Sequence, residues 1–354
     1  KIYIYIYIYM NRKIILMVIL AFLMGFITNY LMGGKILQEN VESIKGKHIT
    51  SDSIWTNSMR EGWNRESGKC FDYTTKNTCN IGDCTWDEEL DNCNLLKLTN
   101  DNILKAVSEF KTESSDFKSP ISIDKYGPIS DWDVSGVTIM TELFKDCVLF
   151  NEDISGWDVS KVTDMSKMFF DCSGFKQDIS SWGEKVSGVL NMSGMFYNCK
   201  LFNQPIGNWD VSKVTDMNMM FSNCYVFNQP LGSWGEKVGS VTDMSGMFYN
   251  CRLFNQPIGN WEVYKVERMN GMFYNCYAFN QPIGRWVVSI VTDMSYMFYV
   301  CTAFNQPLGS WGEKVGNVTD MSYMFYNCTA FNKDISEWKI SPTTKVTSMF
   351  ENAP

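Results

Sequence analysis

Apolar and polar positions repeat with a fixed period from about residue 132 to the end of the chain. Tryptophan marks the period, recurring every 25 or 27 residues at Trp132, Trp157, Trp182, Trp209, Trp234, Trp261, Trp286, Trp311 and Trp338. Where the spacing is 27, the two extra residues follow a Trp-Gly pair, and an insertion confined to one place indicates a surface loop. A period of this length predicts a solenoid, a propeller or a helical array.

Each repeat contains a segment with helical spacing of apolar side chains. In the copy that begins near Asp243, positions i, i+3, i+4 and i+7 are Met244, Met247, Phe248 and Cys251. This spacing predicts one face of a short helix, and an acidic residue at its start suits the positive end of the helix dipole.

The next segment of the repeat predicts a short strand. Pro257 has no N–H to give to a ladder, so it should stand at or before a strand that runs from Ile258 to about Val263. One short helix and one short strand per repeat predict an α/β repeat solenoid of leucine-rich-repeat type, with about nine coils. Its Met, Phe, Cys, Ile, Trp and Val side chains should be buried between stacked coils, whereas a propeller blade needs about 40 residues.

The stretch Val241–Trp261 carries a family resemblance. It reads Val-Thr-Asp-Met-Ser-Gly-Met-Phe-Tyr-Asn-Cys-Arg-Leu-Phe-Asn-Gln-Pro-Ile-Gly-Asn-Trp. This phrase is similar to the repeat of BspA-family leucine-rich-repeat surface proteins, and the resemblance covers roughly residues 97–354. It implies a secreted or surface-anchored, non-catalytic protein linked to adhesion, and it implies no catalytic residues.

The N-terminal part of the sequence predicts export. Residues 1–9 alternate Ile and Tyr and are interpreted as translated upstream sequence, with Met10 as the start. Arg12 and Lys13 then precede the apolar segment Ile14–Met32. Its length lies between a signal-peptide core and a spanning helix, so residues 10–32 are interpreted as an uncleaved signal anchor, with a cleaved signal peptide as the alternative. Either interpretation places the rest of the chain outside the membrane.

A cysteine-rich module follows a polar spacer over residues 33–66. Residues 67–96 contain four cysteines within a short stretch, at Cys70, Cys79, Cys84 and Cys93. After an export signal, this spacing favours two disulfides in a small module, with three possible pairings. The alternative is a zinc site, but the segment lacks a Cys-x2-Cys pair and has no nearby histidine.

The two ends of the repeat region are expected to differ. Residues 97–128 are predicted to form an N-terminal cap, because Ile103, Leu104, Val107 and Phe110 have helical spacing. The solenoid itself is expected over residues 129–354. The segment Val346–Pro354 stops within a coil, so either another subunit covers this end through self-association or the reading frame is truncated there.

One tyrosine per coil is the candidate binding site. The tyrosines that follow the buried phenylalanine are Tyr197, Tyr249, Tyr274, Tyr299 and Tyr326. They should flank the core and form a column that can stack on sugar rings or anchor a protein partner. The alternative is that the rings stack on each other and only stiffen the solenoid. Tyr296 and Tyr323 should thicken the column towards the C-terminus.

Two further registers are expected to be structural. The repeat cysteines are predicted to be buried thiols, although coils one strand spacing apart would also permit disulfides. The asparagines that follow a phenylalanine should bond turn backbones along the solenoid. These are Asn151, Asn203, Asn228, Asn255, Asn280, Asn305 and Asn332, and Lys176 interrupts the series.

Charge and composition narrow the function classes. The 354 residues carry a net charge of −8 and one histidine, His48, so a basic nucleic-acid footprint and a histidine-based triad are both missing. We expect no cofactor and no metal. The sequence predicts a non-catalytic, exported surface protein that binds a protein or glycan partner. The alternative is a structural surface or particle protein that self-assembles through the solenoid.

Overall fold

The computed structural model describes residues 97–113 and 128–354, together with four short strands nearer the N-terminus. The expected upstream segment, the signal anchor over Ile14–Met32 and most of the spacer lie outside the described residues. No helix among the described residues is long and apolar enough to cross a membrane.

The four strands form a small antiparallel sheet. They are β1 (Trp63–Asn64), β2 (Lys69–Cys70), β3 (Cys84–Asp87) and β4 (Asn92–Leu95), in the order β1-β2-β4-β3. Cys93 is paired with Trp86 and Cys84 with Leu95 in the β3–β4 register. Cys79 and the side chains of the other three cysteines lie outside the described part of the chain, so the predicted disulfides remain a prediction.

Helix α5 (Ile103–Glu113) covers the first coil of the solenoid. Its apolar residues Ile103, Val107 and Phe110 are buried, and the Phe110 ring meets Trp132 edge-on with centroids 5.2 Å apart. Just before the helix, Asn100 accepts a bond from the N–H of Thr138 at 2.9 Å. The open edge of the first coil is therefore closed by one helix and one amide side chain.

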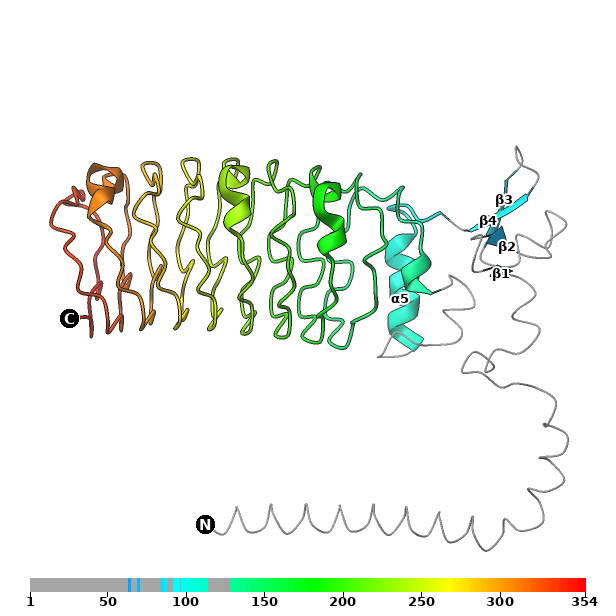
Figure 1. Cartoon of the computed structure of the whole chain (residues 1–354), viewed down its shortest axis with the longest axis horizontal. Coiled ribbons are helices and arrows are strands. Elements are labelled where there is room, and N and C mark those ends of the chain that lie inside the picture. Colours follow the sequence, from blue (N-terminus) through cyan, green and yellow to red (C-terminus); the bar gives the residue numbers. More distant parts are fainter. Residues whose placement is uncertain (1–62, 65–68, 71–83, 88–91, 96, 114–127) are drawn as a thin grey trace, which may run out of the picture. The chain divides into compact units, whose positions relative to one another are not determined.

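From residue 128 the chain winds into coils that stack in one row (Figure 1). Consecutive coils meet at isolated parallel β-bridges. The bridging residues are Ile139, Asp164, Asn191, Asp216, Asp243, Arg268, Asp293, Asp320 and Lys345. This confirms a repeat solenoid whose period follows the tryptophans.

The helix predicted after Asp243 is wrong, because the segment is a series of turns. Gly246 and Asn250 both have left-handed backbones, with φ of +59° and +58°. Met247 donates to the carbonyl of Met244 within its own coil, at 3.2 Å. Alternate N–H groups instead reach the next coil, as Met244 does to Arg268 at 3.0 Å. The segment therefore bonds to its neighbour like a parallel sheet while its backbone turns every few residues.

The strand predicted over residues 258–263 is also wrong, since this side of the coil is irregular in the structure. The regular elements of the solenoid are 3-10 helices: η1 (Ile129–Asp131), η2 (Ser180–Val186), η3 (Gly232–Val238) and η4 (Gly309–Val315). The last three contain the Trp-Gly-Glu-Lys-Val segments of the 27-residue coils. The two extra residues are thus absorbed in a helical turn at one edge.

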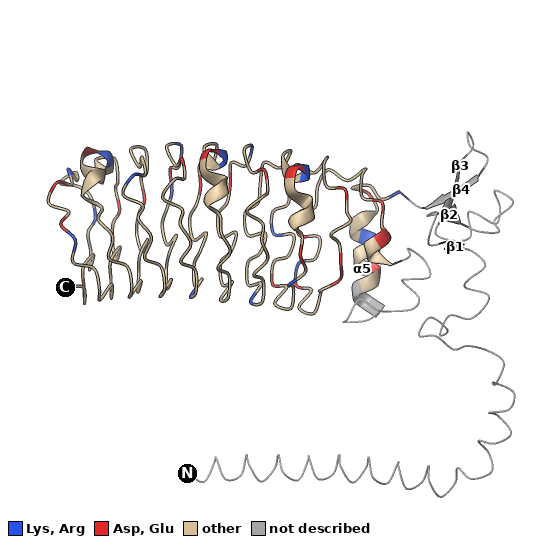
Figure 2. Ribbon diagram, in the orientation of Figure 1, with Lys and Arg blue, Asp and Glu red and all other residues tan. Residues whose placement is uncertain are grey.

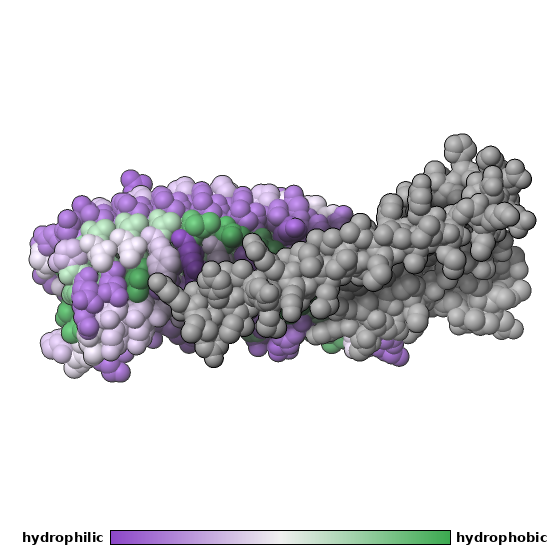
Figure 3. Space-filling model, turned by 90° about the horizontal axis from the view of Figure 1, so that it is seen from below, coloured by the Kyte–Doolittle hydropathy of each residue, from purple (hydrophilic) through white to green (hydrophobic). Residues whose placement is uncertain are grey.

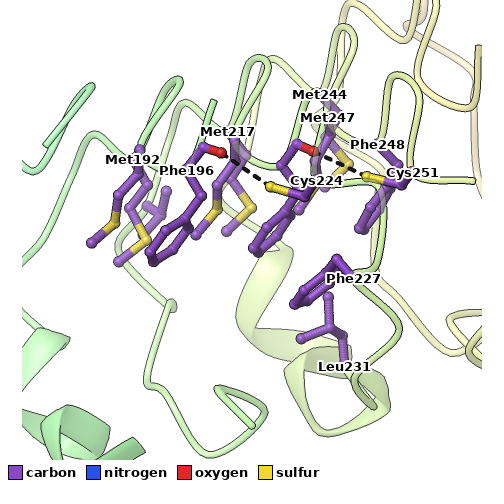
Figure 4. Packing of buried hydrophobic residues seen from close by; sticks show 14 of the residues in the cluster. Met192, Phe196, Met217, Cys224, Phe227, Leu231, Met244, Met247, Phe248 and Cys251 are labelled. Carbon is purple, nitrogen blue, oxygen red and sulfur yellow. Dashed lines mark hydrogen bonds between the residues drawn. The ribbon is translucent and has the colours of Figure 1, made fainter. Parts of the chain in front are cut away.

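The residues predicted to lie inside the coils are buried. Met244, Met247, Phe248 and Cys251 are fully inaccessible, and Trp261 is 3% exposed. Like residues stack in columns along the solenoid (Figure 4): the ring centroids of Phe248 and the phenylalanine one coil on are 5.8 Å apart. Each coil thus completes the burial of its apolar face against its neighbours.

Candidate binding face

Four of the five predicted tyrosines form a continuous row across consecutive coils. This tyrosine row consists of Tyr249, Tyr274, Tyr299 and Tyr326. The fifth, Tyr197, is separated from the row by Ser222 and stacks instead on Phe170, with centroids 4.3 Å apart.

The rings of the tyrosine row stack face to face. Successive centroids are 4.3, 4.4 and 4.8 Å apart, and the ring planes differ by only 5–7°. Both faces of Tyr274 and Tyr299 are therefore covered by other tyrosines. A sugar ring has no open face on these two residues, and a partner can reach only the ring edges and the hydroxyl groups.

A second, shorter row lies beside the first near the C-terminus. Tyr296 and Tyr323 stack with centroids 4.9 Å apart, and they lie tilted 5.7 and 5.9 Å from Tyr299 and Tyr326 respectively. Tyr296 is 39% exposed, so its ring projects from the surface. Together the two rows are called the tyrosine face.

The turns of the coil explain why these side chains point outward. Tyr249 lies between two buried residues, Phe248 and Cys251, and its N–H donates to the carbonyl of Gly246 at 3.0 Å. The left-handed backbone at Gly246 makes this turn, and the equivalent positions two and three coils on are held by Tyr296 and Tyr323. The second row therefore occupies a left-handed position that Gly246 and Gly271 hold in the two coils before it.

Three tyrosines of the face have a pKa raised above the ordinary value of tyrosine. Burial raises the pKa of Tyr274, and the neighbouring hydroxyls of Tyr249 and Tyr299 raise it further. Burial, with Tyr323 next to it, raises the pKa of Tyr296, and the carboxylate of Glu351 raises the pKa of Tyr326. These three side chains are therefore phenol O–H groups at neutral pH, and a phenol O–H can donate a hydrogen bond.

A row of aspartates runs along the bridge positions. Asp243 bonds to Arg268 through Oδ2 and Nη2 at 2.6 Å, and Asp320 lies 3.6 Å from the Nζ of Lys345. Burial raises the pKa of Asp216. Most positions of the coils are uncharged residues, and the 3-10 helices carry neighbouring acidic and basic residues (Figure 2).

The aspartates close turns and do not start helices. Asp243 Oδ1 accepts the N–H of Ser245 at 2.8 Å, and Asp320 Oδ1 accepts that of Ser322 at 2.9 Å. The expectation of a helix cap is therefore corrected to an Asx turn, in which the side chain bonds the backbone two residues on. These carboxylates have a structural partner in each coil.

The cysteine register is a column of buried thiols. From Cys199 to Cys328 the cysteines are free and buried, and the Cys251 Sγ donates to the carbonyl of Phe221, 3.0 Å away (Figure 4). Disulfides between coils are not formed along this stretch. The carbonyl of Phe221 also accepts the N–H of Cys224 at 2.9 Å, so the thiol is a second donor to a carbonyl that is already bonded within its own turn.

The asparagine register is a ladder, as predicted. The Oδ1 of Asn255 accepts the N–H of Asn280 at 2.9 Å and the Nε2 of Gln281 at 2.8 Å. The Oδ1 of Asn228 accepts the N–H of Asn255 in the same way. The amides therefore hold the turn after each phenylalanine, and they are not available as a binding site.

An exposed apolar edge was missed by the sequence analysis. Leu149, Leu201 and Leu253, each two residues after a repeat cysteine, are 58%, 51% and 53% exposed. Figure 3 shows apolar side chains gathered in a lengthwise band on one face of the repeat. The Arg252 guanidinium lies 4.6 Å from the ring centroid of Tyr225 nearby. The sequence contained a signal for this edge, because a leucine stands two residues after the repeat cysteine in these three coils.

In the described part of the chain, no group of three or more His, Cys, Asp or Glu residues is placed so that it could hold a metal ion.

Comparison with protein families gives one match that recurs along the repeat. Residues 113–186, 183–276 and 256–354 each match a family described as Mycoplasma protein of unknown function, DUF285. No curated protein matches the chain.

Proposed function

We propose, on the premise that this chain belongs to the DUF285 repeat family, that it is a non-catalytic surface protein which binds a partner through its solenoid. The partner is a protein or a glycan on a cell or particle surface. The family's description gives no activity, so the proposal depends on the surface of the repeat.

The tyrosine face is the observation that carries this proposal. Six tyrosines from four consecutive coils gather on one face and stack there in two rows. Tyrosine supplies a large contact area at low cost in side-chain entropy, which is why it is enriched where proteins bind partners. The coils hold the rings in fixed stacks, so binding requires no ordering of the face.

The aspartate row favours a binding role over catalysis. Hydrolysis of a glycan would require a pair of carboxyl groups in which one is free to act as acid and the other as base or nucleophile. Asp243 and Asp320 instead bond turn backbones and pair with Arg268 and Lys345.

Export and adhesion complete the proposal. The similarity to BspA-family surface proteins favours adhesion, and the apolar segment Ile14–Met32 would anchor the chain with the repeats outside, or direct its secretion if it is cleaved.

A binding experiment tests the proposal. The full chain is assayed against a broad glycan array and against candidate host cells, beside a variant with Tyr249, Tyr274 and Tyr299 changed to Ser. Ser222 already occupies this position in one coil, so the variant should fold. Tyr264→Ser, at an exposed tyrosine outside the face, is the matched control. We expect the triple variant alone to lose binding; no binding by the folded wild type would contradict the proposal.

A second candidate function is self-assembly through the coil over residues 345–353. Phe350 stacks on Phe325 with centroids 5.4 Å apart, as phenylalanines of successive coils do along the solenoid. A coil of a second copy could continue the same column. Sedimentation over a range of concentrations tests this, and a strict monomer at the highest concentration would exclude it.

A further inference from the structure

The spacing of the tyrosine row matches one peptide conformation. Because the ring planes are nearly parallel, the hydroxyls follow one another at the spacing of the rings, 4.3 to 4.8 Å. Two hydroxyls that are two coils apart are therefore separated by about 9 Å. A polyproline II helix returns to the same side every three residues, which is a rise of about 9.3 Å. An extended strand presents the same side every two residues, at about 6.7 Å, and this repeat matches neither one nor two spacings of the tyrosine row.

The chemistry of the row suits the same conformation. A polyproline II segment has no internal hydrogen bonds, and its carbonyls remain free to accept. Proline offers no N–H, so a surface that recognises its backbone must donate, as the phenol hydroxyls of Tyr274 and Tyr299 can. The exposed ring of Tyr296, stacked on the half-buried Tyr323, gives proline side chains an aromatic wall to pack against, as aromatic-lined grooves do in other proteins.

The acidic residues of the same coils favour a polyproline II segment that also carries basic residues. The carboxylate of Glu351 raises the pKa of Tyr326, and that of Asp320 contributes, after burial and the neighbouring tyrosines, to the raised pKa of Tyr296. Asp320 keeps its bond to the N–H of Ser322 and its ion pair with Lys345, and its side chain is still 26% exposed. A peptide with arginine or lysine next to its prolines would complement these carboxylates.

We propose that the tyrosine face binds a proline-rich, basic protein segment in the polyproline II conformation, with hydroxyls of alternate coils donating to its carbonyls. This inference rests on the proposed binding function and names its partner class. It disfavours glycans, because the stacked rings leave no open face on Tyr274 or Tyr299 for a sugar.

The test measures peptide affinity of the full chain, purified in mild detergent. The probe is a peptide of ten prolines preceded by two arginines; the comparison peptides replace the prolines by alternating Thr and Val, or by Gly and Ser. Alternate hydroxyls are those of Tyr249 and Tyr299 or those of Tyr274 and Tyr326, so the double variant Tyr274→Phe and Tyr299→Phe removes one donor from either pair and keeps the stack. Phe170 already stacks at this position in another coil, so the variant should fold. Tyr197→Phe, outside the row, is the matched control.

We expect binding of the proline peptide alone, weakened about tenfold in the double variant and unchanged by Tyr197→Phe. Equal binding of all three peptides, or proline binding that ignores the hydroxyls, would overturn the inference. If no peptide binds while glycans or cells bind in a tyrosine-dependent way, the inference fails and the proposed function stands. If nothing binds the folded chain, both fail.

Discussion

Val300 occupies a backbone position that disfavours its side chain. Its φ is +55°, in the left-handed region where a β-branched residue is strained. The equivalent positions in the other coils carry Asn or Asp: Asp146, Asp171, Asn198, Asn223, Asn250, Asn275, Asn327 and Asn352. Their amides also bond along the solenoid, as Asn275 Nδ2 does to Asn250 Oδ1 at 2.8 Å.

Val300→Asn should therefore stabilise the protein. Asparagine tolerates the left-handed backbone, and its amide can reach the Oδ1 of Asn275, so the free energy of unfolding should rise by about 1 kcal/mol in urea denaturation. Val300→Ala keeps a Cβ at the same φ and adds no amide, and it should gain less. A variant with Asn that is no more stable than wild type would show that the strain is relieved elsewhere.

At the scale of the element, the sequence predicted which residues are buried but not the backbone that buries them. Met244, Met247 and Phe248 have helical spacing, yet two turns with a left-handed residue every fourth position place them on the same side. The recurrence of Gly246 and Asn250, the residue types that most readily adopt positive φ, was the signal against a helix. Periodicity alone does not distinguish the two, because both return to one face after three or four residues.

The asparagine ladder has one missing step that can be repaired. Lys176 stands where the other coils have asparagine, and the N–H of Asn203 consequently has no side-chain acceptor of the kind that Asn228 gives to Asn255. Lys176→Asn should supply it and raise the free energy of unfolding by about 1 kcal/mol.

Urea denaturation measures this gain, and Lys176→Gln serves as the control because its amide stands one bond further from the backbone. Equal gains from both substitutions would point to the loss of the lysine charge as the cause.

At the scale of the whole molecule, the thiol column should make stability depend on alkaline pH. Burial raises the pKa of Cys328 to about 12 and raises those of Cys199, Cys251, Cys276 and Cys301 well above the ordinary 9.0. These groups stay protonated in the folded chain while the unfolded chain ionises. Their stabilising contribution is thus complete below pH 9 and is lost as the pH rises further.

Each buried thiol should then lower the free energy of unfolding by about 1.4 kcal/mol per pH unit above its unfolded pKa. Urea denaturation between about pH 7 and pH 10 measures how the free energy of unfolding falls with pH. Cys251→Ala should reduce that slope by the contribution of one thiol. Stability that stays flat to pH 10 would contradict the buried, protonated state.

The sequence predicted which tyrosines of the candidate site align from coil to coil, but not how their rings lie against one another. The repeat aligned Tyr249, Tyr274 and Tyr299 because each follows a buried phenylalanine, and the gap at Ser222 was visible in the letters. What the sequence did not contain was the distance across coils, which decides whether the rings present their faces or cover one another. That distance depends on the bonds between adjacent turns, such as the one from Asn250 to the carbonyl of Tyr274 at 2.7 Å.

The identical bonding from coil to coil has a consequence for heredity. The N–H of Met244 meets the carbonyl of Arg268 as that of Met269 meets the carbonyl of Asp293, so any coil offers its successor the same partners. We expect in-frame recombination between two copies of the repeat to yield a folded protein that is longer or shorter by whole coils. The number of repeats, and with it the length of the tyrosine face, can thereby change while the contacts between adjacent coils stay the same.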